Sequence, residues 1–323
     1  MKLTKKYLLG KGTFSEVYLE KDMIHDKSYA IKIIYNSKMN EKLQNEYNIL
    51  KDIQHQNIIK LYYKIKFQDC RCLCLEYCNG GLLYDNLAQY KNKKGKPFPE
   101  NLVQNIMKKI LSGVQYLHNH GIIHGDLKLQ NMLLKYKNDI DAFNQNLFIA
   151  EVKIIDFKSS YKGDILGGIS PINFFDDKID IWSLGNICYE MLFGKPLFSN
   201  MEQMINNILS GGFYIDKTIS VQARKFLYCM LQKDRTKRLN ADQLLNHVFI
   251  TGDYLKFEQY NNGINIININ STNKLNNSKS HLNIHNNYKI SIENSPLKKK
   301  HEINNNIKCN KCGKSPIIDI IYK

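Results

Sequence analysis

The sequence predicts an α+β protein in which a small sheet-rich part is followed by a larger helical part. Residues 7–20, 29–32 and 73–77 are short runs of aromatic, β-branched and other apolar side chains, a composition typical of strands. In residues 99–118 the apolar side chains instead recur at three- and four-residue spacings, as on one face of a helix. With 323 residues, 43% of them apolar, the chain can bury a sizeable core in one large or two ordinary domains.

The formal net charge of +16 would normally suggest a nucleic acid or an anionic membrane as partner. Nearly all of the positive charge is lysine, with only Arg71, Arg224, Arg235 and Arg238 as arginines. Lys, Asn, Ile and Tyr are abundant together, and all four have A/T-rich codons, so genome composition is a competing cause of the charge. We therefore expect no nucleic-acid partner.

The chain shows no membrane or export signal. No apolar run approaches the ~18 residues of a membrane span, and the N-terminus lacks the apolar core of a signal peptide. We expect a cytoplasmic protein without a membrane span. The eight cysteines should then be reduced thiols, because cytosolic glutathione opposes disulfides.

Residues 122–134 place charged and polar side chains between two apolar runs. Asp126, Lys128 and Asn131 lie within six residues of one another. An acid that accepts a hydroxyl proton, a lysine that steadies a transferring phosphate and an amide that holds a divalent ion are the parts that phosphoryl transfer needs. The segment resembles the catalytic loop of protein kinases, His-Arg-Asp-Leu-x-x-x-x-Asn, with Gly125 in place of the arginine.

A glycine-bearing turn precedes this loop in the chain. Gly10 and Gly12 lie between two strand-like runs, with Ser15 at the third glycine position of Gly-x-Gly-x-x-Gly. Such glycines let the backbone approach phosphates closely, although a glycine-rich hairpin without a ligand is at least as common. The turn gains its meaning from the motifs that follow it.

A lysine and a glutamate follow the glycine turn at the intervals that kinases show. Lys32 ends the strand-like Tyr-Ala-Ile-Lys, and Glu46 lies on a helix expected over residues 42–51. A lysine buried on a strand is costly without a partner, so an ion pair with the glutamate is expected. In kinases the corresponding pair holds the α- and β-phosphates of ATP.

Residues 73–81 resemble the kinase hinge. The resemblance implies that Leu75 is the gatekeeper and that the backbone around Glu76 and Cys78 hydrogen-bonds adenine, with Leu133 as the floor beneath the base. The full set that the resemblance assigns to ATP binding is Leu9, Gly10, Gly12, Ser15, Val17, Ala30, Lys32, Glu76, Cys78, Asn131, Leu133 and Asp156.

Residues 151–158 read as a strand that ends in an acid and resemble the Asp-Phe-Gly segment, with Lys158 replacing the glycine. The resemblance implies that Asp156 and Asn131 bind Mg²⁺ and that Lys128 offsets charge on the γ-phosphate. A lysine two positions after Asp126 is similar to serine/threonine kinases. The residues implied in catalysis are Asp126, Lys128, Lys32 and Glu46.

The regulatory positions depart from the family pattern. The activation segment, residues 156–171, is short, and Ile172 stands where a glutamate is expected after Pro171. Arg238 would normally pair with that glutamate; its alternatives are Asp176 or Asp177, or no ion pair at all. Because Gly125 cannot bind a phosphate as the usual arginine does, we expect activity that is independent of activation-loop phosphorylation.

The chain is identified as a member of the protein kinase superfamily, serine/threonine type, with motifs over roughly residues 5 to 250. It is similar to the autophagy-initiating kinases at the hinge and catalytic loop, and to the calcium/calmodulin-dependent kinases at the glycine turn. The resemblance implies the bilobal kinase fold, with an N-lobe over 1–78 and a C-lobe over 79–252. It implies ATP-dependent phosphorylation of serine or threonine on protein substrates; the alternative is a pseudokinase that acts as a nucleotide-binding scaffold or allosteric regulator.

Residues 253–323 form an Asn/Lys-rich tail that has little to bury, and we expect it to be disordered. The tail is a candidate site for a regulatory partner. Cys309 and Cys312 have the spacing of half a zinc ribbon, but no second pair follows. A nucleic-acid or metal-binding adaptor built on this tail is therefore a third class of function, behind the enzyme and the pseudokinase.

Overall fold

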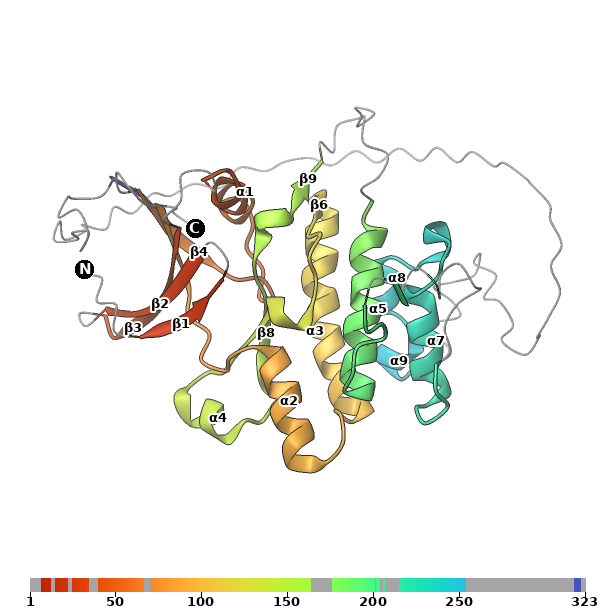
Figure 1. Ribbon diagram of the computed structural model, residues 1–323. Helices are drawn as coiled ribbons and strands as arrows, with labels where there is room; N and C mark the ends of the chain where they lie inside the picture. The colour runs from red at the N-terminus through yellow and green to blue at the C-terminus, as the bar shows by residue number, and fades with distance from the viewer. Residues whose placement is uncertain are drawn as a thin grey trace.

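The structure has two lobes of different composition (Figure 1), as the sequence predicts. It is a computed structural model that describes residues 7–12, 15–22, 25–34, 40–66, 71–163, 176–200, 202–203, 206, 215–253 and 317–320. An antiparallel sheet with one helix forms the N-lobe, and most of the helices form the C-lobe. Residues 13–14 of the glycine turn, residues 164–171 of the predicted activation segment, Ile172 and the tail cysteines lie outside the described residues.

The N-lobe sheet is antiparallel, in the order β1-β2-β3-β5-β4-β10. Helix α1, which confirms the helix expected over 42–51, packs beside it and contacts β4 and β5. The bounds are β1 Leu8–Lys11, β2 Ser15–Asp22, β3 Lys27–Ile34, α1 Asn40–Leu50, β4 Leu61–Lys66, β5 Arg71–Glu76 and β10 Ile317–Ile320.

The side-chain alternation of β3 decides which residues face the space between the lobes. Ile31 and Ile33 are buried in a small cluster on one face of the sheet. Successive side chains on a strand point to opposite faces, so Ala30 and Lys32 lie on the other face. Lys32 pairs in register with Val17 of β2, which places these three predicted site residues together on one face.

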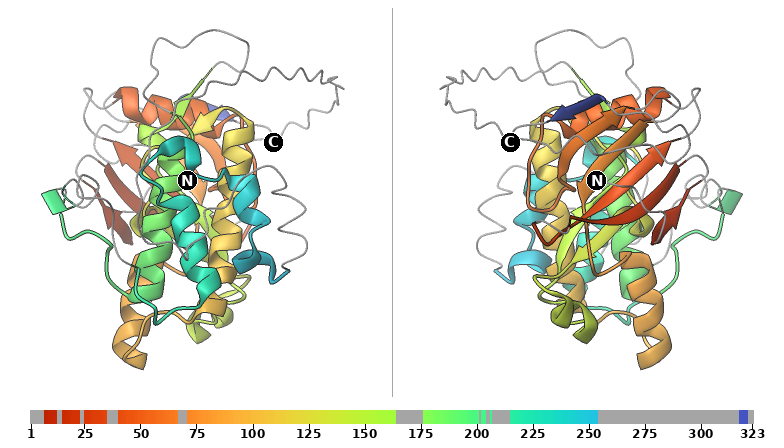
Figure 2. Two further views of the ribbon diagram at one scale, coloured as in Figure 1. Left: turned by 90° about the vertical axis from the view of Figure 1, so that its right-hand side faces the viewer. Right: turned by 90° about the vertical axis from the view of Figure 1, so that its left-hand side faces the viewer.

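Strand β10 belongs to the segment that the sequence assigns to a disordered tail. It pairs antiparallel with β4, with Ile318 opposite Ile65, and Figure 2 shows it in dark blue at the edge of the sheet. Its apolar Ile-Ile-Asp-Ile sequence suits an edge strand. Residues 254–316 and 321–323 lie outside the described residues, so the division of the chain at residues 78 and 252 stays a prediction.

The C-lobe is built around α3, which confirms the helix expected over 99–118. Nine of its residues are buried, along the apolar face that the spacing predicts. Helices α5 and α8 pack against it, and α7 packs against α5. The helices are α2 Leu83–Lys94, α3 Glu100–Asn119, α5 Lys178–Phe193, α7 Val221–Met230, α8 Ala241–Leu245 and α9 Val248–Thr251.

Short strands and 3₁₀ turns lie between the N-lobe sheet and α3 (Figure 1), and the predicted catalytic residues Asp126 and Lys128 lie between β6 and η2. Strand β6 pairs with β9, and β7 pairs with β8, both antiparallel. Their bounds are β6 Ile122–Ile123, η2 Leu129–Asn131, β7 Met132–Lys135, β8 Glu151–Ile154, η3 Phe157–Ser159 and β9 Tyr161–Lys162, while η4 Arg235–Lys237 lies in the C-lobe.

The polar stretch after β7 is a surface insertion. It forms the short helix α4 Asp139–Asn144, capped by the Asn138 side chain, which accepts from Asp141 N. None of the α4 residues is buried, and Phe143 is 87% exposed.

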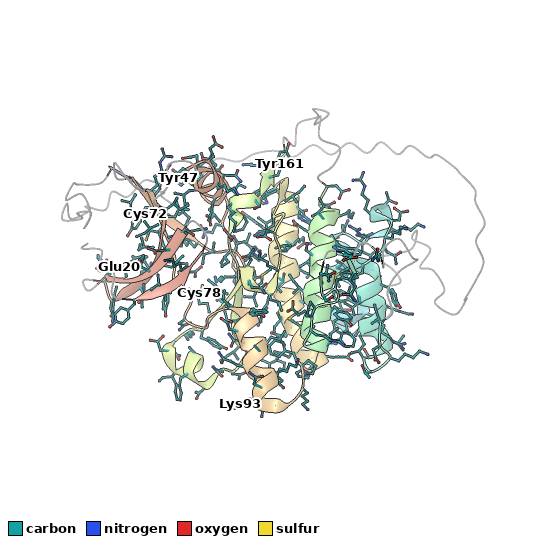
Figure 3. All side chains as sticks on the ribbon, viewed as in Figure 1. Glu20, Tyr47, Cys72, Cys78, Lys93 and Tyr161 are labelled. Carbon is teal, nitrogen blue, oxygen red and sulfur yellow. The ribbon has the colours of Figure 1, made fainter. Side chains whose placement is uncertain are left out.

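Two of the described cysteines, Cys72 and Cys78, are marked in Figure 3. Both are buried and form no disulfide among the described residues, and the same holds for Cys74. Burial raises the pKa of Cys74 and of Cys78 to about 12, so these thiols are protonated and unreactive at neutral pH.

Within the described residues, no helix has the length and apolar character needed to cross a membrane.

Candidate active site

A buried ion-pair network joins the two lobes at Lys32. Its Nζ lies 2.6 Å from Glu46 Oε2 on α1 and 3.1 Å from Asp156 Oδ1, which follows β8. The side chains of Lys32 and Glu46 are only 12% and 2% exposed. Burial alone would lower the pKa of Lys32, but Glu46 and Asp156 outweigh it and hold this pKa above its ordinary value. The expected lysine–glutamate ion pair is thus present.

Asp156 presents its carboxylate to two lysines. Its φ of +70° is in the left-handed region, which is uncommon outside glycine but is tolerated by aspartate better than by most residues. Lys158 Nζ contacts Oδ2, while Lys32 contacts Oδ1. Burial alone would raise the pKa of Asp156, but Lys32 and Lys158 hold it below its usual value. The carboxylate is therefore ionised at neutral pH.

Asn45, next to Glu46 on α1, fixes the backbone that follows Asp156. Its Nδ2 donates to Ser160 O at 2.7 Å and lies 3.4 Å from the carbonyl oxygens of Phe157 and Lys158. One turn of α1 therefore controls both the partner of Lys32 and the path of the Asp156 segment. Sequence reasoning missed Asn45, because an asparagine on a polar helix carries no signal of a distant backbone partner.

The catalytic-loop side chains converge on Asp126. Lys128 Nζ lies 2.9 Å from both carboxylate oxygens of Asp126. Asn131 Nδ2 donates to Asp126 O at 2.7 Å and to Asp126 Oδ2 at 3.1 Å. Because the amide nitrogen of Asn131 is used in this way, Oδ1 is the side-chain atom that could bind a metal ion.

Asp180 on α5 anchors the backbone of this loop. The carboxylate is fully buried and accepts from His124 N at 2.8 Å and Gly125 N at 2.9 Å. His118 Nε2 lies 2.9 Å from the same carboxylate. Burial alone would raise the pKa of Asp180, but His118, His124 and the Gly125 N–H lower it. The ionised Asp180 carboxylate thus holds the backbone of the catalytic loop in place.

His124 connects the catalytic loop to the Asp156 segment. It is fully buried, its Nε2 lies 3.0 Å from Ile155 O, and its ring packs edge-on against Phe157 at 4.9 Å between centroids. Burial lowers the pKa of His124, so the imidazole is neutral at pH 7. Its backbone oxygen accepts from Ser160 Oγ at 3.0 Å, which closes the link between the two segments.

Gly125 adopts a conformation that disfavours any other residue. Its φ is +76°, and a Cβ built there would lie 3.0 Å from Ser159 O. The sequence alone identifies Gly125 as the loss of an arginine; the structure adds that the backbone is left-handed and close to the Asp156 segment. A side chain at this position would press on the loop that holds Asp156.

The described residues of the glycine turn lie where β1 pairs with β2. Gly10 pairs with Val17, and Gly12 N donates to Ser15 O at 2.8 Å. Nothing lies within 4 Å of a Cβ built at Gly10. Leu9 on β1 is 45% exposed.

At the hinge, Glu76 and Cys78 are both buried. Glu76 N donates to Lys60 O at 2.9 Å, and the Glu76 carboxylate lies 2.5 Å from Lys135 Nζ and 3.4 Å from Lys153 Nζ. The Glu76 side chain is thus committed to ion pairs, and only its backbone could meet a base. Leu133, expected beneath adenine, lies on β7 and bridges to Leu82.

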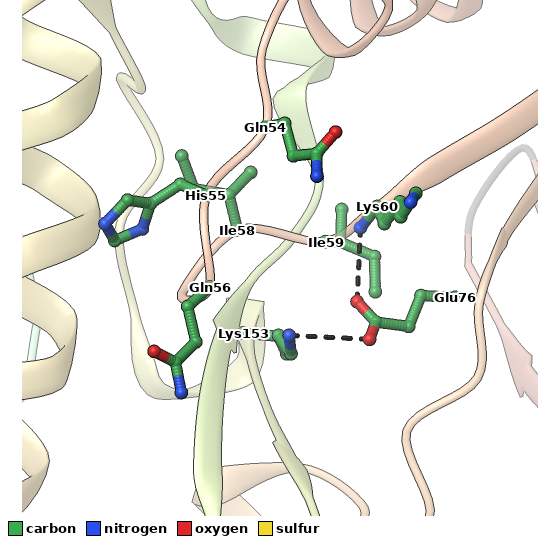
Figure 4. A pocket seen from close by; sticks show the side chains of 8 residues that line it. All are labelled: Gln54, His55, Gln56, Ile58, Ile59, Lys60, Glu76 and Lys153. Carbon is green, nitrogen blue, oxygen red and sulfur yellow. Dashed lines mark hydrogen bonds and ion pairs between the residues drawn. The ribbon is translucent and has the colours of Figure 1, made fainter. Parts of the chain in front are cut away.

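A pocket of about 460 Å³ lies on the Glu76 side-chain face of the hinge (Figure 4). Glu76 is the one residue that it shares with the predicted ATP-binding set. The pocket is lined by Gln54, His55, Gln56, Ile58, Ile59, Lys60, Glu76 and Lys153. It is therefore distinct from the Lys32 network.

Arg238 has no carboxylate partner among the described residues. Its Nε donates to Gln232 O and its Nη1 to Lys178 O, each at 2.8 Å, and its guanidinium lies 4.7 Å from the ring centroid of Trp182. Asp176 pairs with Arg235 instead, at 3.4 Å. Neither Asp176 nor Asp177, the two candidates from the sequence, forms an ion pair with Arg238.

Comparison with known proteins identifies the family to which these motifs belong. A family model described as protein kinase domain matches residues 3–164 and 169–250. The chain belongs to the protein kinase family. This kinase is 31% identical over 274 residues to myosin light chain kinase A of Dictyostelium discoideum, covering 80% of this chain and 90% of that protein. It is 33% identical over 267 residues to calcium-dependent protein kinase 4 of Plasmodium falciparum (isolate 3D7), covering 75% of this chain and 48% of that protein.

The predictions of a bilobal α+β kinase fold and of a serine/threonine-type protein kinase are confirmed. Among the predicted catalytic residues of this kinase, the structure joins Lys32 to Glu46 and Lys128 to Asp126. Asn131 also contacts Asp126, and Asp156 contacts Lys32. The roles of the glycine turn and hinge in nucleotide binding stay predictions.

Proposed function

We propose that this kinase transfers the γ-phosphate of ATP to serine or threonine hydroxyls of protein substrates. The observation that carries the proposal is the meeting of Lys32 and Asp156, which are 124 residues apart in the chain, at 3.1 Å. A cation and an ionised carboxylate from different lobes have little structural reason to be buried together. Both are needed where phosphates and a divalent ion bind between the lobes.

Lys32 would bind the α- and β-phosphates while Glu46 keeps its ammonium in place. Because Glu46 already fixes the ammonium, Lys32 loses little conformational freedom when a phosphate binds. Most of the electrostatic attraction between them then contributes to binding. The backbone near Gly10 has room beside it for a phosphate, and the carbonyl of Glu76 and the N–H of Cys78 would meet adenine above Leu133.

The donor set near Asp156 suits Mg²⁺. Asp156 is ionised, and Asn131 uses its amide nitrogen toward Asp126, so a carboxylate and an amide oxygen of the kind that Mg²⁺ prefers would be available. No group of three His, Cys, Asp or Glu residues in the described part of the chain could hold a metal ion. Substrate phosphates would therefore supply further ligands, as is usual for Mg²⁺. When bound, the ion would offset negative charge on the β- and γ-phosphates.

Asp126 would accept the proton of the substrate hydroxyl, and Lys128 would stabilise charge on the transferring phosphate. The two side chains are 29% and 48% exposed, so a protein substrate could reach them. Lys128 already contacts both Asp126 oxygens at 2.9 Å. An arriving γ-phosphate would compete for the ammonium and release one carboxylate oxygen for the hydroxyl.

The test is phosphate transfer from ATP with Mg²⁺ to a generic basic protein, with ATP binding measured in parallel. Asp126→Asn should bind ATP like the wild type but transfer phosphate at least 100-fold more slowly, the usual range for removal of a general base. Asp85→Asn, which removes an exposed carboxylate from the first turn of α2, is the matched control and should retain activity. Equal transfer by wild type and Asp126→Asn would sink the enzymatic proposal.

The second candidate function is a pseudokinase that binds nucleotide as a scaffold or allosteric regulator. The contact of Lys158 with Asp156 favours it, because a lysine occupies the carboxylate that should meet the metal. In that case wild type and Asp126→Asn would bind ATP equally and both transfer no phosphate above background. A regulatory partner at the tail and a cytoplasmic location belong to either candidate as further predictions.

A further inference from the structure

Both carboxylate oxygens of Asp156 face a lysine. Lys32 Nζ lies 3.1 Å from Oδ1, and Lys158 Nζ contacts Oδ2. Lys158 stands where the family pattern has glycine, which has no side chain. This chain therefore brings a cation to the metal-binding carboxylate that the family pattern does not provide.

The charges of the network show what Lys158 changes. Lys32 and Glu46 offset each other, and Asp156 and Lys158 offset each other, so the four groups sum to zero. Without Lys158 the same site would carry one net negative charge. ATP without a metal brings several negative charges of its own, so a neutral network repels it less than an anionic one.

Lys158 is also placed so that it can leave. Its side chain is 40% exposed, whereas that of Asp156 is 16% exposed. Asp156 is the one carboxylate that pairs with it among the described residues. A lysine is a flexible point charge that water solvates readily, so a divalent ion could displace it from Oδ2 without unfolding the segment.

We propose that Lys158 is an internal cation that competes with Mg²⁺ for Asp156 and so reduces the dependence of nucleotide binding on the metal. The inference rests on the proposed ATP site. Binding of ATP and of Mg²⁺ are thermodynamically coupled, and the coupling is reciprocal. A lysine bound to Asp156 weakens this coupling in two ways. Its charge strengthens the binding of ATP without a metal, and its contact with Asp156 weakens the binding of Mg²⁺.

The experiment measures the dissociation constant of ATP for the full chain by calorimetry, once in EDTA and once with saturating Mg²⁺. The dissociation constant in EDTA divided by the dissociation constant with Mg²⁺ reports the coupling between the metal and ATP. Lys158→Met removes the charge and keeps an unbranched side chain, and we expect it to raise the ratio about tenfold, equivalent to about 1.4 kcal/mol. Lys158→Arg keeps the charge and should behave like the wild type.

The matched control is Lys162→Met. Lys162 lies four residues further on, is 47% exposed and pairs with Asp52 at 3.5 Å, so its loss should leave the ratio unchanged. A ratio for Lys158→Met within twofold of the wild type, with ATP bound, would overturn the inference and leave the ATP site standing. A ratio for Lys158→Arg that matches Lys158→Met would also overturn it, since shape and not charge would then decide. Absence of ATP binding by the wild type under both conditions would overturn the proposed function as well.

Discussion

Gly125→Ala tests whether the glycine in the catalytic loop is required by its backbone. The substitution adds a Cβ at a φ of +76°, 3.0 Å from Ser159 O. The left-handed conformation alone costs an L-residue about 1–2 kcal/mol. The contact with Ser159 O is tighter than normal, and relieving it must shift the backbone that follows Asp156. We therefore expect a loss of about 2 kcal/mol or more in the free energy of unfolding.

Gly95→Ala is the matched control, because it separates the two contributions. Gly95 has a φ of +68°, but nothing lies within 4 Å of its built Cβ. It should show the backbone penalty alone, about 1–2 kcal/mol. The assay is urea unfolding of both variants and the wild type, compared by their midpoints at equal slope.

The functional readout of Gly125→Ala should exceed its effect on stability. His124 and Gly125 donate to Asp180 at one end of the loop, and Ser159 lies in the segment of Asp156. A displacement at Ser159 would therefore move the Asp156 carboxylate against Lys32 and weaken ATP binding at temperatures where the variant is folded. If Gly125→Ala is no less stable than Gly95→Ala and binds ATP normally, the argument from crowding is wrong.

Three further predictions concern Asp180, His247 and the effect of phosphatase treatment. Asp180→Ala leaves two backbone N–H groups of the catalytic loop without their acceptor, so urea unfolding should show a loss on the order of 3 kcal/mol, and an unchanged midpoint would contradict the anchoring role. Burial lowers the pKa of His247 from 6.5 to about 4, so the unfolded chain binds more protons between these values and stability should fall by up to about 3 kcal/mol as pH falls from 6.5 to 4. His247→Asn, which can still accept from Phe249 N as a helix cap, should flatten that part of the pH profile, and an identical profile would refute the assignment. Phosphatase treatment should leave kinase activity unchanged, because Gly125 cannot bind a loop phosphate; loss of activity would show that another residue does so.

The sequence predicts strands and helices from periodicity, and it predicts the bilobal fold and the main site from the resemblance of its motifs to those of protein kinases. Alternation on β3 places Ala30 and Lys32 on one face, and the helical spacing in 99–118 predicts the buried face of α3. These features are local patterns whose consequences are geometric.

The remaining features depend on contacts between distant segments, which a single sequence does not show. The pairing of β10 with β4 joins a four-residue strand to an edge more than 250 residues earlier in the chain. Asn45 donates to the distant carbonyl of Ser160, and Arg238 donates to two main-chain oxygens where the family pattern would give it a carboxylate. For Lys158, the sequence shows the lost glycine, but the contact with Asp156 depends on the side-chain conformation.

The central claim is that Lys32, Asn131 and Asp156 form one site for ATP and Mg²⁺. A crystal structure of the full chain with Mg²⁺ and a non-hydrolysable ATP analogue tests it most directly. We predict phosphates on Lys32 Nζ, with the Lys32–Glu46 ion pair retained, and a metal ion bound by Asp156 and Asn131 Oδ1 with Lys158 displaced from Asp156. A nucleotide bound elsewhere, such as the pocket beside Glu76, with Asp156 still paired to both lysines, would contradict the claim.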